Sequence, residues 1–343
     1  MAVRIPVADS LLGVKPMSHS NISIFVPHLG CPHRCSFCDQ NAITGSNALP
    51  DGEYVKALLS KALDDGLDPA SSEIAFFGGS FTAIPREYML ELLESCQPFL
   101  KQGFQGIRLS TRPDCVSYEI LDILRDYGVR TVELGAQSMD DSVLLLNERG
   151  HTSLDVELAS SRIKEYGIRL GLQMMVGLYG STKELDILTA KRLIALNPDE
   201  ARIYPVAVMR GTTLGRLYES GEYRTYPMDE ALELLAKLLS MFSESGIPVI
   251  KLGLHSSVDV ESRLLGGIYH PALRELCESL IYRRELESMI EKEGVREFTV
   301  PKRNLSSAIG HKKSNLSYFR EKGIEISIKP SDSQTERLLP AQI

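Results

Sequence analysis

The sequence predicts an α/β fold, a parallel partial (β/α)6-type TIM-like barrel with a small α/β C-terminal appendage. Three observations predict it. Apolar segments of about five residues alternate with segments of about ten or more residues at helical spacing. Polar or glycine-rich residues follow one expected strand after another, as they do at the catalytic rim of a βα barrel. The alternation stops near residue 256, which marks the beginning of the appendage.

The expected strands and helices alternate along most of the chain. Short β-type runs predict strands over 21–27, 73–77, 106–110, 131–134, 169–176, 200–205 and 248–254. Apolar residues at helical spacing predict helices over 54–63, 86–100, 118–127, 155–166, 183–196 and 228–245. These segments share no sequence repeat, so they predict one barrel-like architecture and not a solenoid.

Three divisions of the chain are expected: an N-terminal extension over 1–20, a barrel domain over 21–255 and a C-terminal accessory domain over 256–343. Two prolines interrupt the extension, and no periodicity is sustained there. In the accessory domain we expect helices over 270–293 and 304–322, the second interrupted at Gly310, strands over 295–301 and 323–329, and a polar tail.

The composition is that of a globular protein, with 43% hydrophobic and 24% charged residues among 343. No apolar run approaches the ~18 residues that would span a membrane, and the N-terminus lacks the apolar core of a signal peptide. The sequence therefore predicts a cytoplasmic protein. The net charge of −7 does not indicate a nucleic-acid binder. Residues 301–323, however, carry six lysines and arginines against Glu321 alone, a local charge of +5.

Three of the six cysteines lie within eight residues, spaced C-x3-C-x2-C, directly after the first expected strand: Cys31, Cys35 and Cys38. In a reducing compartment, clustered cysteines more often bind metal or do chemistry than form disulfides. Three thiolates cannot complete the four ligands of a structural zinc. On a [4Fe–4S] cluster they leave one iron open for a small molecule. The remaining cysteines are isolated in sequence and are expected to be small buried side chains: Cys96, Cys115 and Cys277.

The motif C-x3-C-x-aromatic-C after the first strand of such a scaffold resembles that of the radical S-adenosylmethionine (SAM) superfamily. Six further stretches resemble, in the same order, the radical domain of the Elongator catalytic subunit and its short bacterial relatives: 76–82, 110–114, 132–138, 147–152, 174–178 and 203–205. The resemblance covers roughly residues 21–255, and a weaker similarity continues through 267–271.

This resemblance implies an enzyme that uses a [4Fe–4S] cluster on Cys31, Cys35 and Cys38 to cleave SAM reductively. The products would be methionine and a 5′-deoxyadenosyl radical, which abstracts hydrogen from a substrate. A reductant protein such as flavodoxin or ferredoxin is the implied electron donor.

The resemblance also implies which residues bind SAM near the cysteines. Phe37 matches the aromatic that packs near the adenine, although plain core packing is the alternative. Gly78 and Gly79 match the glycines whose carbonyls accept the ligand's amino group, and a tight turn is the alternative. The family often has an acidic residue next, whereas this chain has Ser80, as Elongator-like members do.

Further polar residues at the strand ends complete the implied SAM site. Ser110 and Gln173 stand where relatives contact the ribose hydroxyls, and Gln137 stands where a polar contact to the ligand is common. Arg149 stands where a guanidinium meets the ligand's carboxylate, a pairing that suits its fork of donors. The alternatives are ordinary rim polarity for the first three and an exposed helix-end charge for Arg149.

Candidate catalytic residues lie at the ends of the last two strands: Tyr204, Lys251 and His255. Each is also explained as an ordinary polar rim residue. Because Elongator-like relatives modify transfer RNA, RNA is the expected substrate class, with the basic residues 302–322 as a candidate contact. The alternative for this segment is an ordinary solvated charged face. Tyr318 and Phe319 in that segment are candidates for stacking on a base.

Two departures from the relatives narrow the function. The Elongator subunit spaces its first two cysteines further apart and carries an acetyltransferase domain, whereas only 88 residues follow position 255 here. Oxygen-independent coproporphyrinogen oxidase has an extra cysteine where this chain has Gln40. A coproporphyrinogen oxidase-like or other small-molecule radical SAM enzyme remains the enzymatic alternative. An iron–sulfur or zinc binding scaffold is the non-enzymatic one.

Overall fold

The computed structural model describes residues 3–4, 20–26, 31, 35–38 and 49–331. The chain forms two compact units. The barrel unit consists of Lys15–Pro227 and Ile247–Pro271, and the terminal unit consists of Met1–Val14, Met228–Gly246 and Ala272–Ile343. The segment Met228–Gly246 thus belongs with the C-terminal residues. The domain boundaries expected at residues 20 and 255 stay predictions.

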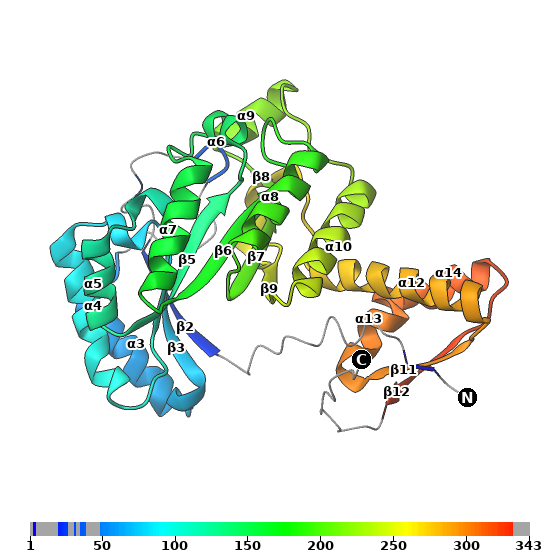
Figure 1. The fold of residues 1–343 in the computed structure, drawn as a ribbon, viewed down its shortest axis with the longest axis horizontal. Helices are drawn as coiled ribbons and strands as arrows, with labels where there is room; N and C mark the ends of the chain where they lie inside the picture. The colour runs from blue at the N-terminus through cyan, green and yellow to red at the C-terminus, as the bar shows by residue number, and fades with distance from the viewer. Residues whose placement is uncertain (1–2, 5–19, 27–30, 32–34, 39–48, 332–343) are drawn as a thin grey trace. The chain divides into compact units, whose positions relative to one another are not determined.

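A seven-stranded parallel sheet forms the barrel unit (Figure 1), in the order β2-β3-β4-β5-β6-β7-β9. Its strands are Ser20–Val26 (β2), Ser72–Gly78 (β3), Ile107–Thr111 (β4), Val129–Gln137 (β5), Arg169–Val176 (β6), Glu200–Pro205 (β7) and Val249–Leu252 (β9). Every neighbouring pair is parallel, from β2 with β3 to β7 with β9. The predicted parallel partial barrel is therefore confirmed.

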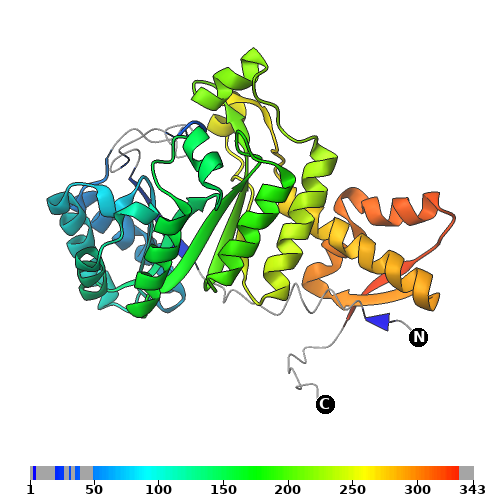
Figure 2. The ribbon, with the colours of Figure 1, turned by 45° about the horizontal axis from the view of Figure 1, so that its top comes forward.

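Helices connect the strands and cover one face of this sheet (Figures 1 and 2). They are Gly52–Asp64 (α3), Arg86–Leu100 (α4), Tyr118–Asp126 (α5), Ser153–Glu165 (α7) and Lys183–Ala195 (α8). Polar side chains begin several of them. Asp51 accepts a hydrogen bond from the Tyr54 amide at 2.7 Å, and Thr152 forms a reciprocal capping box with Asp155. Between the layers lie fully buried apolar side chains, among them Ile74, Leu109, Val132, Leu134 and Leu172.

A two-stranded antiparallel ribbon and three short helices were not expected from the sequence. The ribbon pairs Ala207–Met209 (β8) with Leu264–Gly267 (β10). The helices are Asp141–Leu146 (α6), Thr213–Ser220 (α9) and Val258–Arg263 (α11). The helices have only six to eight residues, too few for a repeated helical pattern of apolar residues. The ribbon partners are far apart in sequence. Periodicity alone could not find them.

The terminal unit combines helices with a three-stranded parallel sheet in the order β1-β11-β12. Its elements are Val3–Arg4 (β1), Met228–Glu244 (α10), Leu273–Glu293 (α12), Glu297–Pro301 (β11), Leu305–Ile309 (α13), Ser314–Glu321 (α14) and Ser327–Ser331 (β12). Tyr282, Leu286, Phe298, Val300 and Phe319 form its core. Residues 3 and 4, expected within an extension, instead pair with β11.

Two expectations for the terminal unit need correction. Phe319 is only 1% exposed, so the prediction that it stacks on an RNA base is wrong. The last strand begins at Ser327 and not at residue 323, because the turn after α14 continues through Gly323, whose φ is 73°. No helix of the described residues is long and apolar enough to cross a membrane.

Candidate functional site

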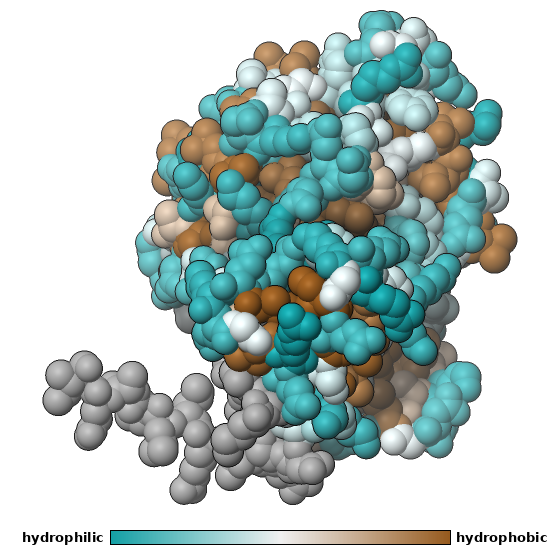
Figure 3. Space-filling view, turned by 90° about the vertical axis from the view of Figure 1, so that its right-hand side faces the viewer, coloured by the Kyte–Doolittle hydropathy of each residue, from teal (hydrophilic) through white to brown (hydrophobic). Residues whose placement is uncertain are grey.

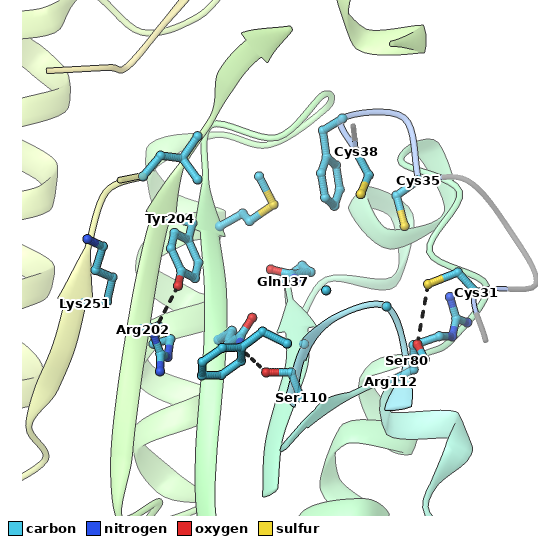
Figure 4. A pocket seen from close by; sticks show the side chains of 18 of the residues that line it. Cys31, Cys35, Cys38, Ser80, Ser110, Arg112, Gln137, Arg202, Tyr204 and Lys251 are labelled. Atoms are coloured by element: carbon cyan, nitrogen blue, oxygen red, sulfur yellow. Dashed lines mark hydrogen bonds between the residues drawn. The ribbon is translucent and has the colours of Figure 1, made fainter. Parts of the chain in front are cut away.

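A cavity of about 700 Å³ opens at the carboxyl ends of the strands of the barrel unit. Its size lies within the range of ~300–1,000 Å³ typical of small-molecule sites. The lining comes from β2 and the cysteine segment, from the ends of β3 to β7, and from β9 and the residues after it (Figure 4). This is the edge of a βα barrel at which catalytic groups gather.

All thirteen residues predicted for the site line this one cavity: Cys31, Cys35, Phe37, Cys38, Gly78, Gly79, Ser110, Gln137, Arg149, Gln173, Tyr204, Lys251 and His255. Proximity alone does not assign their individual roles, which stay predictions.

The cysteines lie along one wall, where Cys35 is buried and Cys31 and Cys38 are half-buried. Arg149 donates from Nη1 to the sulfur of Cys35 at 2.9 Å and from Nη2 to the Gly135 carbonyl at 2.7 Å. The Oγ of Ser80 lies 3.7 Å from the sulfur of Cys31 (Figure 4). The cysteine wall is thus held by residues that follow β3 and β5.

The donor set of this wall fits an iron–sulfur cluster. No three histidine, cysteine or acidic side chains of the described residues are gathered closely enough to hold a single metal ion. A [4Fe–4S] cluster does not require the three thiolates to meet at one ion, because each thiolate binds an iron of its own. Three cysteines on one cavity wall, with a guanidinium already directed at one sulfur, are compatible with that group.

The Gly78–Gly79 turn lets the backbone lie close to β2. Gly78 has a φ of 111°, and a Cβ there would come within 2.9 Å of the Val26 carbonyl oxygen. The amide of Gly79 donates to that same oxygen at 2.8 Å. A larger residue at Gly78 would therefore displace the turn from the cavity edge.

Phe37 lines the cavity and also packs against a buried apolar cluster that includes Val143 and Val206. Core packing, the alternative given for Phe37, therefore describes part of its environment, and the contact with the adenine stays a prediction. The backbone beside it is fixed as well, since the Leu214 amide donates to the Ser36 carbonyl at 2.7 Å.

Polar side chains of the central strands line the cavity floor. Gln173 donates from Nε2 to Ser110 Oγ at 3.4 Å and to Glu133 Oε2 at 3.0 Å. Gln137 has a φ of 65°, unusual for a residue with a side chain, at an irregularity in the pairing of β5 with β6. Its Oε1 is buried and has no hydrogen-bond partner among the described residues. An acceptor left in this state at a cavity is available to a ligand.

Arg112 is a lining residue to which the sequence assigned no role. Its Nε and Nη2 donate to the Asp114 carboxylate at 3.0 and 2.9 Å, whereas its buried Nη1 has no partner in the described part of the chain. Burial alone would lower the pKa of Arg112, but Asp114 outweighs this and raises it. Arg112 is therefore a fixed cation with one free donor. The sequence did contain a signal for Arg112, namely an arginine directly after an expected strand and two positions before an aspartate.

Arg202 is a second lining residue that sequence reasoning missed. It forms an ion pair with Glu133, its guanidinium lies 5.3 Å from the centre of the Phe77 ring, and Nη1 donates to the Tyr204 hydroxyl at 3.4 Å. Burial raises the pKa of Tyr204, so this hydroxyl stays protonated at neutral pH. Arg202 and Tyr204 lie together on the wall formed by β7 (Figure 4).

The three cysteines outside the motif differ from one another. Cys96 and Cys277 are buried as expected, and burial raises the pKa of each to about 12. Cys115, which was also expected to be buried, is half-buried. Its pKa is raised first by burial, then by Asp114, and to a smaller extent by Cys31, whose charge is close enough to act on it.

Comparison with known proteins identifies this architecture. The model of the radical SAM superfamily matches residues 25–190, and that of the radical SAM C-terminal domain matches 198–283. The tRNA uridine(34) acetyltransferase of Dehalococcoides mccartyi is 26% identical over 270 residues, which are 68% of this chain and 58% of that protein. An uncharacterized protein of Methanocaldococcus jannaschii is 30% identical over 228 residues, 63% of this chain and 70% of that protein.

Among solved structures, Elp3 of the archaeon Methanocaldococcus infernus, lacking its N-terminus, superposes with a TM-score of 0.62. The match covers 85% of this chain and 70% of that one at 21% identity, so it shows the fold alone. The chain spans little more than half the length of the Dehalococcoides relative.

Proposed function

The chain belongs to the radical S-adenosylmethionine superfamily, and from this premise we propose that it is a member that modifies RNA, with transfer RNA as the favoured class. As a member of the superfamily it is an enzyme whose cofactors are a [4Fe–4S] cluster and SAM. Bound together, these supply a 5′-deoxyadenosyl radical for hydrogen abstraction. One observation carries the proposal, namely a single cavity with the three cysteines on one wall and an aromatic and cationic region at β2, β7 and β9.

On the cysteine side, we assign Cys31, Cys35 and Cys38 to the cluster. The residues along the floor, Ser110, Gln137 and Gln173, would then hold the nucleoside part of SAM. Support comes from the unpaired Oε1 of Gln137 and from the Ser110–Gln173 contact at 3.4 Å. The side chains of Ser110, Gln137 and Gln173 thus bring hydrogen-bond donors and acceptors to the same cavity.

On the substrate side, the lining suits a nucleotide. Phe25, 37% exposed, and Phe77 line the cavity with their ring centres 6.4 Å apart, and aromatic faces of this kind stack on bases. Lys251 brings a positive charge to the same region, which favours an anionic backbone, whereas Arg202 beside it is paired with Glu133. Tyr204, held protonated, is the proposed proton donor or radical partner closest to this region.

The whole activity of the curated relatives is not carried over. The relatives that match are named tRNA uridine(34) acetyltransferase, and this chain spans 58% of the first of them. What we transfer as a proposal is the substrate class, RNA, and not the acetyl chemistry. A tetrapyrrole or other small molecule would need the same cavity and is the competing substrate. We further propose a cytoplasmic location and a flavodoxin- or ferredoxin-like electron donor.

The cluster assignment is tested by anaerobic reconstitution of the full chain. The wild type is expected to bind about four irons per chain and, with SAM and dithionite, to form 5′-deoxyadenosine detected by mass spectrometry. Cys35→Ala should lose both. Cys115→Ala, the same substitution at a nearby cysteine outside the motif, should retain both. If Cys35→Ala kept a full complement of iron, the ligand assignment would be wrong.

The substrate class is tested separately, by comparing the nucleosides of transfer RNA from strains with and without the gene. We expect at least one modified nucleoside to disappear in the deletion strain and to return with the wild-type gene but not with Cys35→Ala. An unchanged nucleoside profile, together with 5′-deoxyadenosine formation on coproporphyrinogen, would replace RNA with the tetrapyrrole alternative.

A further inference from the structure

The C-terminal part of the terminal unit has a β-α-α-β order and lies beyond residue 283, where the family models end. β11 leads into α13, a four-residue loop over 310–313 leads into α14, and β12 returns beside β11. The two strands are parallel, with Phe298 opposite Ile328. Phe298 and Phe319 join the sheet and the helices in one apolar core, so the four elements form a single packed module.

The loop over 310–313 (Gly-His-Lys-Lys) is fixed at its base. Gly310 has a φ of 90°, and a Cβ there would lie 2.4 Å from Ser314 Oγ and 2.6 Å from the Asn315 amide nitrogen. The Lys313 amide donates to the Gly310 carbonyl at 2.8 Å. Asn315, only 1% exposed, donates from Nδ2 to the carbonyls of Ala308 and Ser279 at 3.0 and 2.8 Å. The loop thus has one defined conformation.

Two consecutive lysines of this loop adopt the left-handed backbone conformation. Lys312 has a φ of 52° and Lys313 a φ of 63°, a region that is unfavourable for residues with a Cβ. Both side chains are exposed, and neither has an ion-pair partner among the described residues. The fold therefore presents two adjacent ammonium groups at a strained position, where glycine or asparagine would fit more easily.

The neighbouring charges leave the loop positive. The segment 301–323 carries +5, and Lys302, Arg303 and Arg320 in it are also exposed. Acidic groups from the adjoining helix α12 face only part of it. Glu275 lies 3.5 Å from His311 Nδ1, and Glu278 accepts from Ser307 at 3.0 Å.

At the other end of α14, by contrast, the positive charge is compensated. Glu287 pairs with Lys322 at 2.8 Å, and Tyr318 lies between Arg283 and Lys322, 4.7 and 4.4 Å from its ring centre. The charge of Lys322 is therefore paired within the protein, unlike the charges of Lys312 and Lys313.

We propose that β11, α13, the loop, α14 and β12 form an RNA-binding module of the KH kind, whose Gly310–Lys313 loop clamps the backbone of single-stranded RNA. KH modules hold about four nucleotides of backbone on a GXXG loop. Here Gly310 supplies the first glycine, and Lys313 takes at the fourth position the left-handed conformation that a glycine would adopt. The two lysines add charge where phosphates would lie.

The surface of the terminal unit agrees with a polar ligand. Every large hydrophobic side chain of the described residues that is strongly exposed belongs to the barrel unit. On the face that Figure 3 turns to the viewer, hydrophilic side chains predominate and hydrophobic ones gather in smaller areas. A duplex RNA binder needs cations spread over about 16 base pairs, whereas Lys312 and Lys313 lie next to each other in one short loop.

The inference rests on the proposed function, from which it takes RNA as the ligand. It is tested by measuring RNA binding without the SAM reaction. The full-length protein, without SAM or reductant, is titrated against a labelled single-stranded RNA of about 12 nucleotides, three times the length that one KH loop holds. The variant K312D/K313D inverts both charges with a residue type that tolerates the left-handed conformation. The control K237E/K292E makes the same charge change at two exposed lysines of the same unit that lie outside the module, on α10 and α12.

We expect K312D/K313D to bind at least tenfold more weakly than the wild type and K237E/K292E to stay within twofold. The slope of log affinity against log salt should fall by about 1.4 in the loop variant, since each phosphate of a single strand that a lysine neutralises adds ~0.7 to that slope. Circular dichroism checks the fold, and K312N/K313N, which only removes the charges, should give an intermediate loss if the aspartate variant does not fold.

Three outcomes would overturn the inference: equal affinity of the loop variants and the wild type, an equal loss in the control, or competition by duplex RNA as strong as by single-stranded RNA. Both loop variants should still form 5′-deoxyadenosine from SAM without RNA. RNA binding that depends on the loop, with no change in the nucleosides of the deletion strain, would support the module and contradict the proposed substrate.

Discussion

Two clusters of polar side chains in the barrel unit are buried to a similar degree but differ in how they are satisfied. In the interior cluster, Arg108, 2% exposed, forms ion pairs with Glu73, Glu133 and Glu200. In the rim cluster, three residues that line the cavity each keep one buried polar atom without a hydrogen-bond partner among the described residues: Arg112, Gln137 and Arg149. The interior charges stabilise the fold, whereas the rim atoms are left for a ligand.

The energetic consequence follows from the cost of burying polar groups. Burial alone would raise the pKa of Glu133, but Arg202 and Arg108 outweigh it and lower that pKa, so the carboxylate stays ionised. At the rim, Arg112 is paired with Asp114, but single atoms of Arg112, Gln137 and Arg149 have no hydrogen-bond partner in the described part of the protein, and a buried unsatisfied group costs ~1–3 kcal/mol. A ligand that pairs with these atoms recovers that free energy. The comparison therefore predicts that interior substitutions reduce stability and rim substitutions reduce ligand affinity.

The largest effect is expected for Arg108→Met. The substitution leaves three buried carboxylates without their shared cation, and breaking a buried ion pair from one side costs ~3–5 kcal/mol. Urea unfolding followed by circular dichroism measures the loss in the free energy of unfolding. Arg86→Met, at an exposed pair with Glu119, is the matched control and should change stability far less. Equal losses in the free energy of unfolding of Arg108→Met and Arg86→Met would show that the interior ion pairs stabilise the fold no more than an exposed pair does.

The next effect concerns His151, whose pKa is lowered to about 4 by burial and by the charge of Arg149. The folded state keeps this ring neutral, while the unfolded chain binds a proton below about pH 6.5. Stability should therefore fall as the pH drops from 6.5 towards 4, by about 2 kcal/mol between pH 7 and 5. His151→Gln should remove this part of the pH dependence, as measured by urea unfolding of the cluster-free chain.

Asp186 provides an opposing control for that measurement. Burial raises its pKa to about 6, so the folded state takes up a proton more readily than the unfolded chain. Its contribution to stability therefore grows as the pH falls through 6. In Asp186→Asn the acid destabilisation should be steeper than in the wild type. A pH profile of His151→Gln that matched the wild type would show that His151 is not buried in its neutral form.

A smaller effect is expected for Arg112→Lys at the rim. Lysine keeps the charge but loses the fork that pairs with Asp114 while leaving Nη1 free. We expect SAM to bind about tenfold more weakly, equivalent to ~1.4 kcal/mol, with little change in the unfolding midpoint. Calorimetric titration of the anaerobically reconstituted protein measures the affinity. The control Arg125→Lys, on the exposed face of α5, should leave the SAM affinity unchanged. If the wild type and both variants bound SAM equally tightly, Arg112 would not belong to the SAM site.

The strand ends explain why so much of the rim was predictable. Parallel strands bring their carboxyl ends to one edge, so Ser110, Gln137 and Gln173 could be expected together from their positions alone. Arg202 could not, because its partner Glu133 is 69 positions away and no local pattern joins them. For the same reason the pairing of Val3–Arg4 with β11 was not foreseen. For the loop over 310–313 the sequence marked only an interruption at Gly310, since the left-handed lysines after it have no sequence signature.

Gln173 carries the smallest and most discriminating expectation, because it contacts both clusters. It donates to Glu133 in the interior and to Ser110 at the rim. In Gln173→Met, Glu133 keeps Arg108 and Arg202, so the free energy of unfolding should change by no more than ~1 kcal/mol. Ser110 is left without this donor, and SAM affinity should fall about threefold to fivefold. A loss of stability above ~2 kcal/mol with unchanged SAM affinity would assign Gln173 to the interior cluster. Gln173 would then have no part in binding SAM.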